Sequence, residues 1–165
     1  QLLRDDPEYA EKAERFASRV RDASEHVSLE ASRASMGPVP MRVALQDSCH
    51  LLHAQKVGGE LRAALARVPE LEVVEAREQQ LCCGSAGIYN LVQPKAAAQL
   101  GQRKAAQILA TAPDAYVSAN PGCLIQVSAA LRSEGVAIPA LHPGEVLDAS
   151  IRGLSGEKLR AGARG

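Results

Sequence analysis

The stretch Met41–Gln46, "MRVALQ", predicts a short β-strand, and residues 55–68 predict the helix that follows it. The same alternation then repeats along the chain. Further strands are predicted at Leu71–Glu75, Ala115–Ser118 and 136–141, and further helices at Pro94–Leu109, 121–132 and 144–151. Alternating strands and helices are typical of a parallel sheet covered by helices. We therefore expect an α/β fold, with a parallel, Rossmann-like sheet of about four strands and helices on both faces.

Composition agrees with this class of fold and excludes others. The 165 residues are enough for one domain, and only one Phe and three Tyr are aromatic, so Ala, Val, Leu and Ile must fill the core. Lys plus Arg equals Asp plus Glu at 19 each, which argues against a nucleic-acid partner. No apolar run approaches the length of a membrane span and no signal peptide is recognisable. We expect a cytoplasmic protein.

The ends of the chain differ from its middle. Asp6 and Pro7 form a helix start, and an apolar stripe from Tyr9 to Val27 predicts one helix of about five turns. We therefore divide the chain into a leading helix and linker at 1–40, a compact domain at 41–152, and a mobile tail at 153–165.

The four cysteines all follow predicted strands. Cys49 comes just after the first strand, Cys82 and Cys83 lie in the loop after the second, and Cys123 comes just after the third. In a parallel sheet the carboxyl ends of the strands share one edge, where open α/β folds bind their ligands. The four thiols are therefore expected to meet in space.

Local sequence supports a site for bound metal. Asn120 is a good N-cap, which places Cys123 in the first helical turn, where free N–H groups and the helix dipole favour the thiolate. Gly84, Ser85 and Gly122 let the backbone approach a cofactor and can offer N–H donors to sulfur.

Other interpretations of the cysteines stay open. Any one of them could be a small buried apolar residue. A disulfide between Cys82 and Cys83 would be strained, because adjacent Cα atoms lie about 3.8 Å apart and disulfides prefer about 4.4–6.8 Å. Four thiolates could also form a closed tetrahedral zinc site. The shared strand-end position of all four thiols favours a common site.

The cysteine spacing resembles that of a known family. Cys49, then 32 residues, then Cys82-Cys83-Gly84, then Cys123 is similar to the CCG cysteine-rich domain. The segments "DSCHLLHAQK", "LCCGSAGIYN" and "NPGCLIQ" also resemble the iron-sulfur subunits of glycolate oxidase (glycolate dehydrogenase).

The resemblance implies an electron-transfer role and a set of partners. A flavin subunit carrying FAD would oxidise glycolate to glyoxylate, and the iron-sulfur subunit would pass electrons toward quinone. This chain would be the last cysteine-rich repeat, after a ferredoxin-like part and an earlier repeat, and would not itself oxidise glycolate. Peripheral association with the inner face of the membrane would come through the complex.

The same resemblance implies that Cys49, Cys82, Cys83 and Cys123 are the metal ligands. The family pattern ends in C-x-x-C, whereas Gln126 stands at the last position here. Four thiolates suffice for a [4Fe–4S] cluster, which we favour over zinc.

Three histidines are further candidates for the same site. His142 follows the fourth predicted strand. His50 and His53 flank Cys49, with His53 about one helical turn away, and either could donate a hydrogen bond to cluster sulfur. The main alternative is a structural or docking domain that binds zinc or no metal, with Leu3 and Phe16 on its contact surface. Thiol–disulfide chemistry at Cys82 and Cys83 is a third hypothesis, disfavoured by the geometry of vicinal cysteines.

Overall fold

The computed structural model describes residues 2–31, 33–55 and 57–162. Expectations that fall on Gln1, Ser32, Lys56 and residues 163–165 lie outside the described residues.

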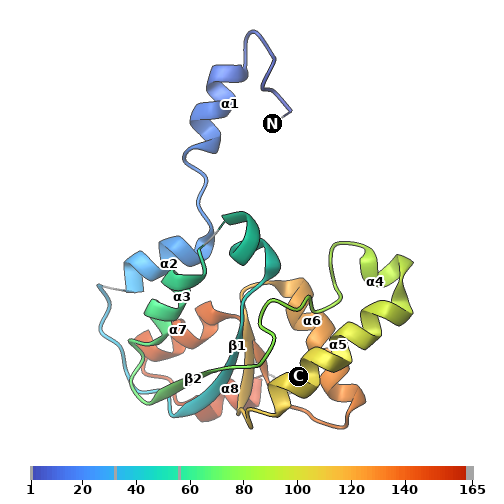
Figure 1. The fold of residues 1–165 in the computed structure, drawn as a ribbon. Coiled ribbons are helices and arrows are strands. Elements are labelled where there is room, and N and C mark those ends of the chain that lie inside the picture. The colour runs from blue at the N-terminus through green and yellow to red at the C-terminus, as the bar shows by residue number, and fades with distance from the viewer. Residues whose placement is uncertain (1, 32, 56, 163–165) are drawn as a thin grey trace.

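A four-stranded, entirely parallel sheet forms the centre of the fold (Figure 1). Its strands are β1 (Met41–Gln46), β2 (Leu71–Glu75), β3 (Ala115–Ser118) and β4 (Ala140–Leu141), in the order β2-β1-β3-β4. The first three strands have the predicted bounds. The fourth is shorter than predicted, because Pro139 has no N–H to donate and the N–H of Val136 donates to the carbonyl of Leu131 at the end of the preceding helix.

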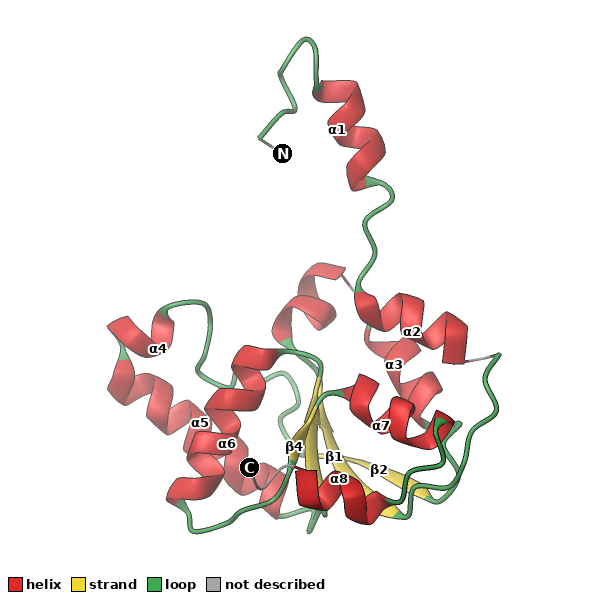
Figure 2. Ribbon diagram, turned by 180° about the vertical axis from the view of Figure 1, so that it is seen from behind, coloured by secondary structure: helices red, strands yellow, loops and turns green. Residues whose placement is uncertain are grey.

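Helices cover both faces of the sheet, as predicted (Figure 2). On one face, Val43 and Leu45 of β1 and Val117 of β3 pack against α2 (Ala23–Ala31), α3 (Gly58–Leu65) and α7 (Pro143–Ile151). On the other face, Ala44 and Tyr116 pack against α5 (Pro94–Leu109) and α6 (Pro121–Ser133). Successive strand residues alternate between the two cores because side chains in a strand point to opposite faces.

The leading segment forms two helices, so the prediction of a single helix was wrong. Helix α1 (Ala10–Ala17) buries no residue and stands away from the body (Figure 1), whereas α2 packs against α3. The second helix begins after Asp22. The Asp22 carboxylate accepts from the N–H of Ser24 at 2.8 Å, and the Glu25 carboxylate accepts from the backbone N–H of Asp22 at 2.8 Å. This is a capping box, and the sequence "DASE" carries its signature within the apolar stripe.

The carboxyl-terminal segment is also more ordered than predicted. Residues Gly156–Gly162 form α8, and Leu159 packs against the core that α3 and α7 share. Arg160 pairs with Asp114 at 2.9 Å, which ties this helix to the loop before β3. Part of the segment that we expected to be a tail therefore forms a helix that packs on the domain.

None of the helices in the described ranges combines the length and apolar character that crossing a membrane requires.

Candidate metal centre

Three loops at the carboxyl ends of neighbouring strands bring the four cysteines together. Cys49 lies between β1 and the π-helix η1 (His50–Gln55), Cys82 and Cys83 lie in the loop between β2 and α4 (Tyr89–Val92), and Cys123 lies in the first turn of α6. All four line one pocket of about 250 Å³. Its other lining residues are Ser48, His50, Ser85, Ala86, Gly87 and Asn120. The parallel topology thus produces the predicted meeting of thiols.

The four thiols are free and interact in two pairs. The Sγ atoms of Cys83 and Cys123 lie 3.2 Å apart, and both side chains are buried. Cys49 interacts with Cys82, whose charge and hydrogen bond, after burial, raise the pKa of Cys49. The N–H of Gly84 donates to the Sγ of Cys82 at 3.4 Å, so the predicted N–H···S contact is present.

One sulfur of the buried pair is the more acidic. The hydrogen bond with the Cys123 side chain lowers the pKa of Cys83 to about 6 against the opposing effect of burial, and the N–H of Ser85 acts in the same direction. The hydrogen bond with Cys83 and burial both raise the pKa of Cys123. The N–H of Cys123 donates to Asn120 Oδ1 at 3.0 Å, as expected for a residue in the first turn of α6.

Two glycines hold the loops close together. Gly84 has a φ of +91°, and a Cβ at this position would lie 2.4 Å from the carbonyl oxygen of Ala97 in α5. A Cβ at Gly122 would lie 2.8 Å from Ser85 Oγ. The close approaches that we predicted for these glycines are therefore made to protein atoms. They seat the cysteine loop against α5 and against the start of α6.

Two of the three candidate histidines lie outside the pocket, and the third, His50, lines it. His53 is exposed on η1 and does not line the pocket. His142 caps α7. Its ring Nδ1 accepts from the N–H of Gly144 at 3.1 Å, and its backbone N–H donates to the Glu145 carboxylate at 2.6 Å. His50, which follows Cys49 directly, is the histidine that lines the pocket.

Gln126, at the position of the missing fifth cysteine, holds helices together. Its Nε2 donates to the carbonyl of Ala97 at 3.2 Å, and its Oε1 accepts from Asn90 Nδ2 at 3.5 Å. It is not among the residues that line the pocket. The site therefore offers four thiols.

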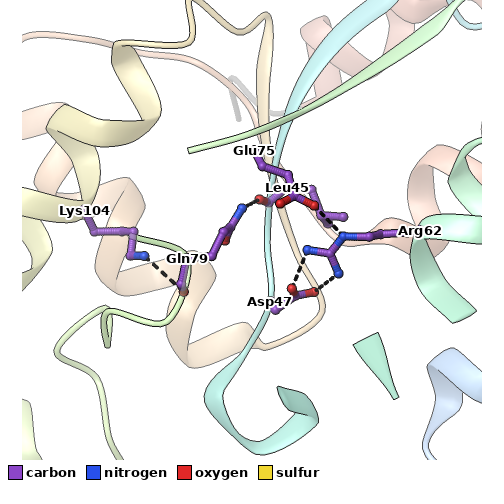
Figure 3. Close-up of polar contacts among 6 residues, drawn as sticks. All are labelled: Leu45, Asp47, Arg62, Glu75, Gln79 and Lys104. Atoms are coloured by element: carbon purple, nitrogen blue, oxygen red, sulfur yellow. Dashed lines mark hydrogen bonds and ion pairs between the residues drawn. The ribbon is translucent and has the colours of Figure 1, made fainter. Parts of the chain in front are cut away.

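An ion-pair network that sequence reasoning missed supports the end of β1. Buried Asp47 accepts two hydrogen bonds from the Arg62 guanidinium of α3, at 3.0 and 2.5 Å, and Arg62 also pairs with Glu75 at the end of β2 (Figure 3). Asp47 precedes Cys49 by two residues, so the network fixes the backbone that leads into the site. The three residues come from separate parts of the chain, and only Asp47 lies within a cysteine motif.

The pocket has the chemistry of a thiolate metal site, although within the described ranges no three Cys, His, Asp or Glu side chains are preassembled for coordination. Zn–S bonds of about 2.3 Å place tetrahedral ligand sulfurs about 3.8 Å apart, so Cys83 and Cys123 must separate and both be deprotonated to bind zinc. The Ser48 hydroxyl oxygen lines the pocket, is buried and has no hydrogen-bond partner among the described residues. Four convergent thiols, an N–H donor and an unsatisfied hydroxyl fit a metal–thiolate group.

Fold and site together define a parallel α/β domain with a four-cysteine centre at its strand ends. The chain belongs to the CCG cysteine-rich domain family, which matches residues 43–128.

Several named proteins are similar to most of this chain. A "Probable glycolate oxidase iron-sulfur subunit" from Bacillus subtilis (strain 168) is 35% identical over 150 residues, covering 88% of this chain and 34% of that protein. The "Glycolate oxidase iron-sulfur subunit" of Escherichia coli (strain K12) is 32% identical, with 81% and 32% covered. A fumarate reductase (CoM/CoB) subunit of Methanothermobacter marburgensis is 37% identical, with 78% and 27% covered. The chain thus spans about a third or less of the length of these relatives.

Proposed function

We propose that this chain is an iron-sulfur electron-transfer module of a glycolate-oxidising flavoenzyme complex. The observation that carries the proposal is the convergence of Cys49, Cys82, Cys83 and Cys123 on one pocket at the carboxyl edge of the sheet. Relatives named as subunits of glycolate oxidase and fumarate reductase support it.

In this proposal the four thiolates hold a [4Fe–4S] cluster, which would supply one-electron transfer when bound. The protein's own groups then set the environment of the sulfurs. The N–H of Gly84 donates to Cys82, and hydrogen bonds of this kind stabilise negative charge on sulfur and raise a cluster's potential. Burial of Cys83 and Cys123 keeps water away from that half of the site. Ser85 lines the pocket beside Gly122, where a Cβ would lie 2.8 Å from the Ser85 hydroxyl oxygen.

The wider assignment follows the relatives named above. We propose that a partner subunit carries FAD and oxidises glycolate to glyoxylate, that electrons pass through this module toward quinone, and that residues 41–152 are the cysteine-rich unit itself. Residues 1–40 would lead from an earlier cysteine-rich repeat, beyond a ferredoxin-like part. Attachment to the cytoplasmic face of the membrane would come through partner subunits.

A zinc-binding docking domain is the second candidate. Exposed apolar side chains on and beside α1, among them Phe16 at 74% exposure, favour a contact role for this segment. Four thiolates would also complete the tetrahedral coordination of a structural zinc ion.

Anaerobic purification followed by iron, sulfide and zinc analysis, with EPR spectra of oxidised and reduced samples, separates the two candidates. The proposal expects equal amounts of iron and inorganic sulfide and a redox-dependent EPR signal. Cys83→Ser should remove most of the iron, whereas His53→Ala, which changes an exposed residue outside the pocket, should retain it. Stoichiometric zinc without iron, in protein prepared without air, would overturn the iron-sulfur assignment.

A further inference from the structure

Lys104 is a buried cation on α5. Its side chain is 0% exposed, although α5 also carries exposed charged residues such as Lys95. Lysine is almost never fully buried unless its charge is compensated, because removing an ammonium from water is costly. A compensating negative group is therefore expected nearby.

The hydrogen bonds of Lys104 tie α5 to the loop that precedes the vicinal cysteines. Its Nζ donates to the carbonyl oxygen of Glu78 at 2.8 Å. It also donates to the carbonyl oxygen of Gln79 at 3.4 Å (Figure 3). The Gln79 side chain in turn donates to the carbonyl of Leu45 in β1 at 2.7 Å. These acceptors are neutral, so they position the ammonium without cancelling its charge.

The side-chain carboxylate of Glu78, whose backbone carbonyl Lys104 contacts, is committed to another partner. Glu78 receives the guanidinium of Arg103, which is exposed on α5, and no carboxylate in the described part of the chain forms an ion pair with Lys104. Burial lowers the pKa of Lys104, and the groups whose charged forms oppose this effect are Cys49, Cys83, Glu78 and Cys123. Three of the four cysteines of the pocket, when they are thiolates, therefore act electrostatically on this ammonium.

We infer that Lys104 is the buried counter-charge of the four-thiolate centre, held in place by the Glu78 and Gln79 carbonyls. Four thiolates around a dication, whether zinc or an oxidised [4Fe–4S] core, leave net negative charge in a site with little water. A fixed ammonium nearby offsets that charge and favours both binding of the metal group and uptake of an electron. The inference rests on the proposed metal-binding function, but not on the identity of the metal.

Two substitutions separate charge from hydrogen bonding. Lys104→Gln removes the charge and retains an N–H donor for the loop carbonyls, whereas Lys104→Met removes both. Lys95→Met is the matched control, since it makes the same change at an exposed position of the same helix. Circular dichroism of each variant verifies the fold. Metal binding is then measured with Co²⁺ alone, from the sulfur-to-cobalt charge-transfer absorption, and the midpoint potential is measured on anaerobically reconstituted cluster.

Both Lys104 variants should bind Co²⁺ about 10–100-fold more weakly than the parent chain, and both should shift the cluster potential to more negative values. Lys95→Met should do neither. Parent-like Co²⁺ affinity and potential in Lys104→Gln would overturn the counter-charge role, even if Lys104→Met were impaired. Absence of any iron cluster in the parent chain, with Co²⁺ binding still dependent on Lys104, would instead reject the iron-sulfur function and support this inference.

Discussion

The Sγ atoms of Cys83 and Cys123 lie 3.2 Å apart although 40 positions separate the two residues in the chain. The contact joins the loop after β2 to the first turn of α6, and it forms a hydrogen bond between the two sulfurs. Its consequence is that these two cysteines have very different acidities, although both are buried.

The first prediction concerns this hydrogen bond. In metal-free protein, the pKa of Cys83 near 6 means that its sulfur is protonated below about pH 6 and is a thiolate above it. Cys123→Ala removes the hydrogen-bond partner with the largest effect and leaves burial opposed by weaker hydrogen bonds, so the pKa of Cys83 should rise. A titration of thiolate absorbance in the ultraviolet should show the low-pH transition in the parent chain and lose it in Cys123→Ala. Cys49→Ala should retain it, and persistence of the transition without Cys123 would contradict the hydrogen-bonded arrangement of the two sulfurs.

Gly84 provides a stability prediction. Gly84→Ala combines a φ of +91° with a Cβ that would overlap the Ala97 carbonyl, so it should lower the free energy of unfolding by about 3 kcal/mol or more. Gly87→Ala lies in the same loop at a φ of +64° with open space around its Cβ, and should cost only about 1 kcal/mol. Urea denaturation of both metal-free variants tests the difference. Equal losses would show that the contact with α5 does not constrain the loop.

The Asp47–Arg62 pair gives a third prediction. Asp47→Asn keeps the shape of the side chain but removes the charge that Arg62 binds with two hydrogen bonds, so unfolding free energy should fall by about 1–3 kcal/mol. Glu75→Gln changes a half-exposed partner of the same guanidinium and should cost within about 0.5 kcal/mol. Thermal denaturation with matched buffers checks both values. A larger loss in Glu75→Gln would mean that the exposed pair, and not the buried one, anchors β1.

The fourth prediction concerns Asn120. Its side chain caps α6 by accepting from the N–H of Cys123, so Asn120→Ala should destabilise the fold by about 1 kcal/mol and weaken metal binding by misplacing Cys123. Asn120→Ser retains a capping oxygen and should recover most of both losses. Zinc competition with a chromophoric chelator measures the affinity. If Asn120→Ser lost as much stability and metal affinity as Asn120→Ala, the capping role would be excluded.

Much of the fold could be predicted from local sequence. Strands β1, β2 and β3 and helix α5 begin and end at the predicted residues, because apolar runs and a proline at the first helical turn act locally. The break between α1 and α2 also has a local signal, the capping box at Asp22 and Glu25, but the apolar stripe running through it masks that signal. Strand β4 is short because Pro139 has no N–H to donate. Pairing at this residue is limited to its carbonyl oxygen, which accepts from the N–H of Tyr116.

The candidate site divides in the same way. That four thiols meet could be predicted, since all three cysteine-bearing loops follow parallel strands. Lys104 could not be found from the sequence, because a lysine on an amphipathic helix has no local mark of burial. His142 does follow a strand, as predicted, yet its ring nitrogen caps its own helix, and His142 is not among the residues that line the cysteine pocket.

The sequence by itself determined the order of strands and helices, the parallel sheet and the shared edge at which the cysteines gather, because these follow from residue periodicity and from the geometry common to parallel sheets. Only the tertiary structure decided which two sulfurs contact each other, which lysine is buried against the cysteine loop and which glycine lies against a helix. Those properties depend on distances between residues from different elements, and a hydrogen bond or a buried charge changes its energy over a few ångströms that local sequence does not encode.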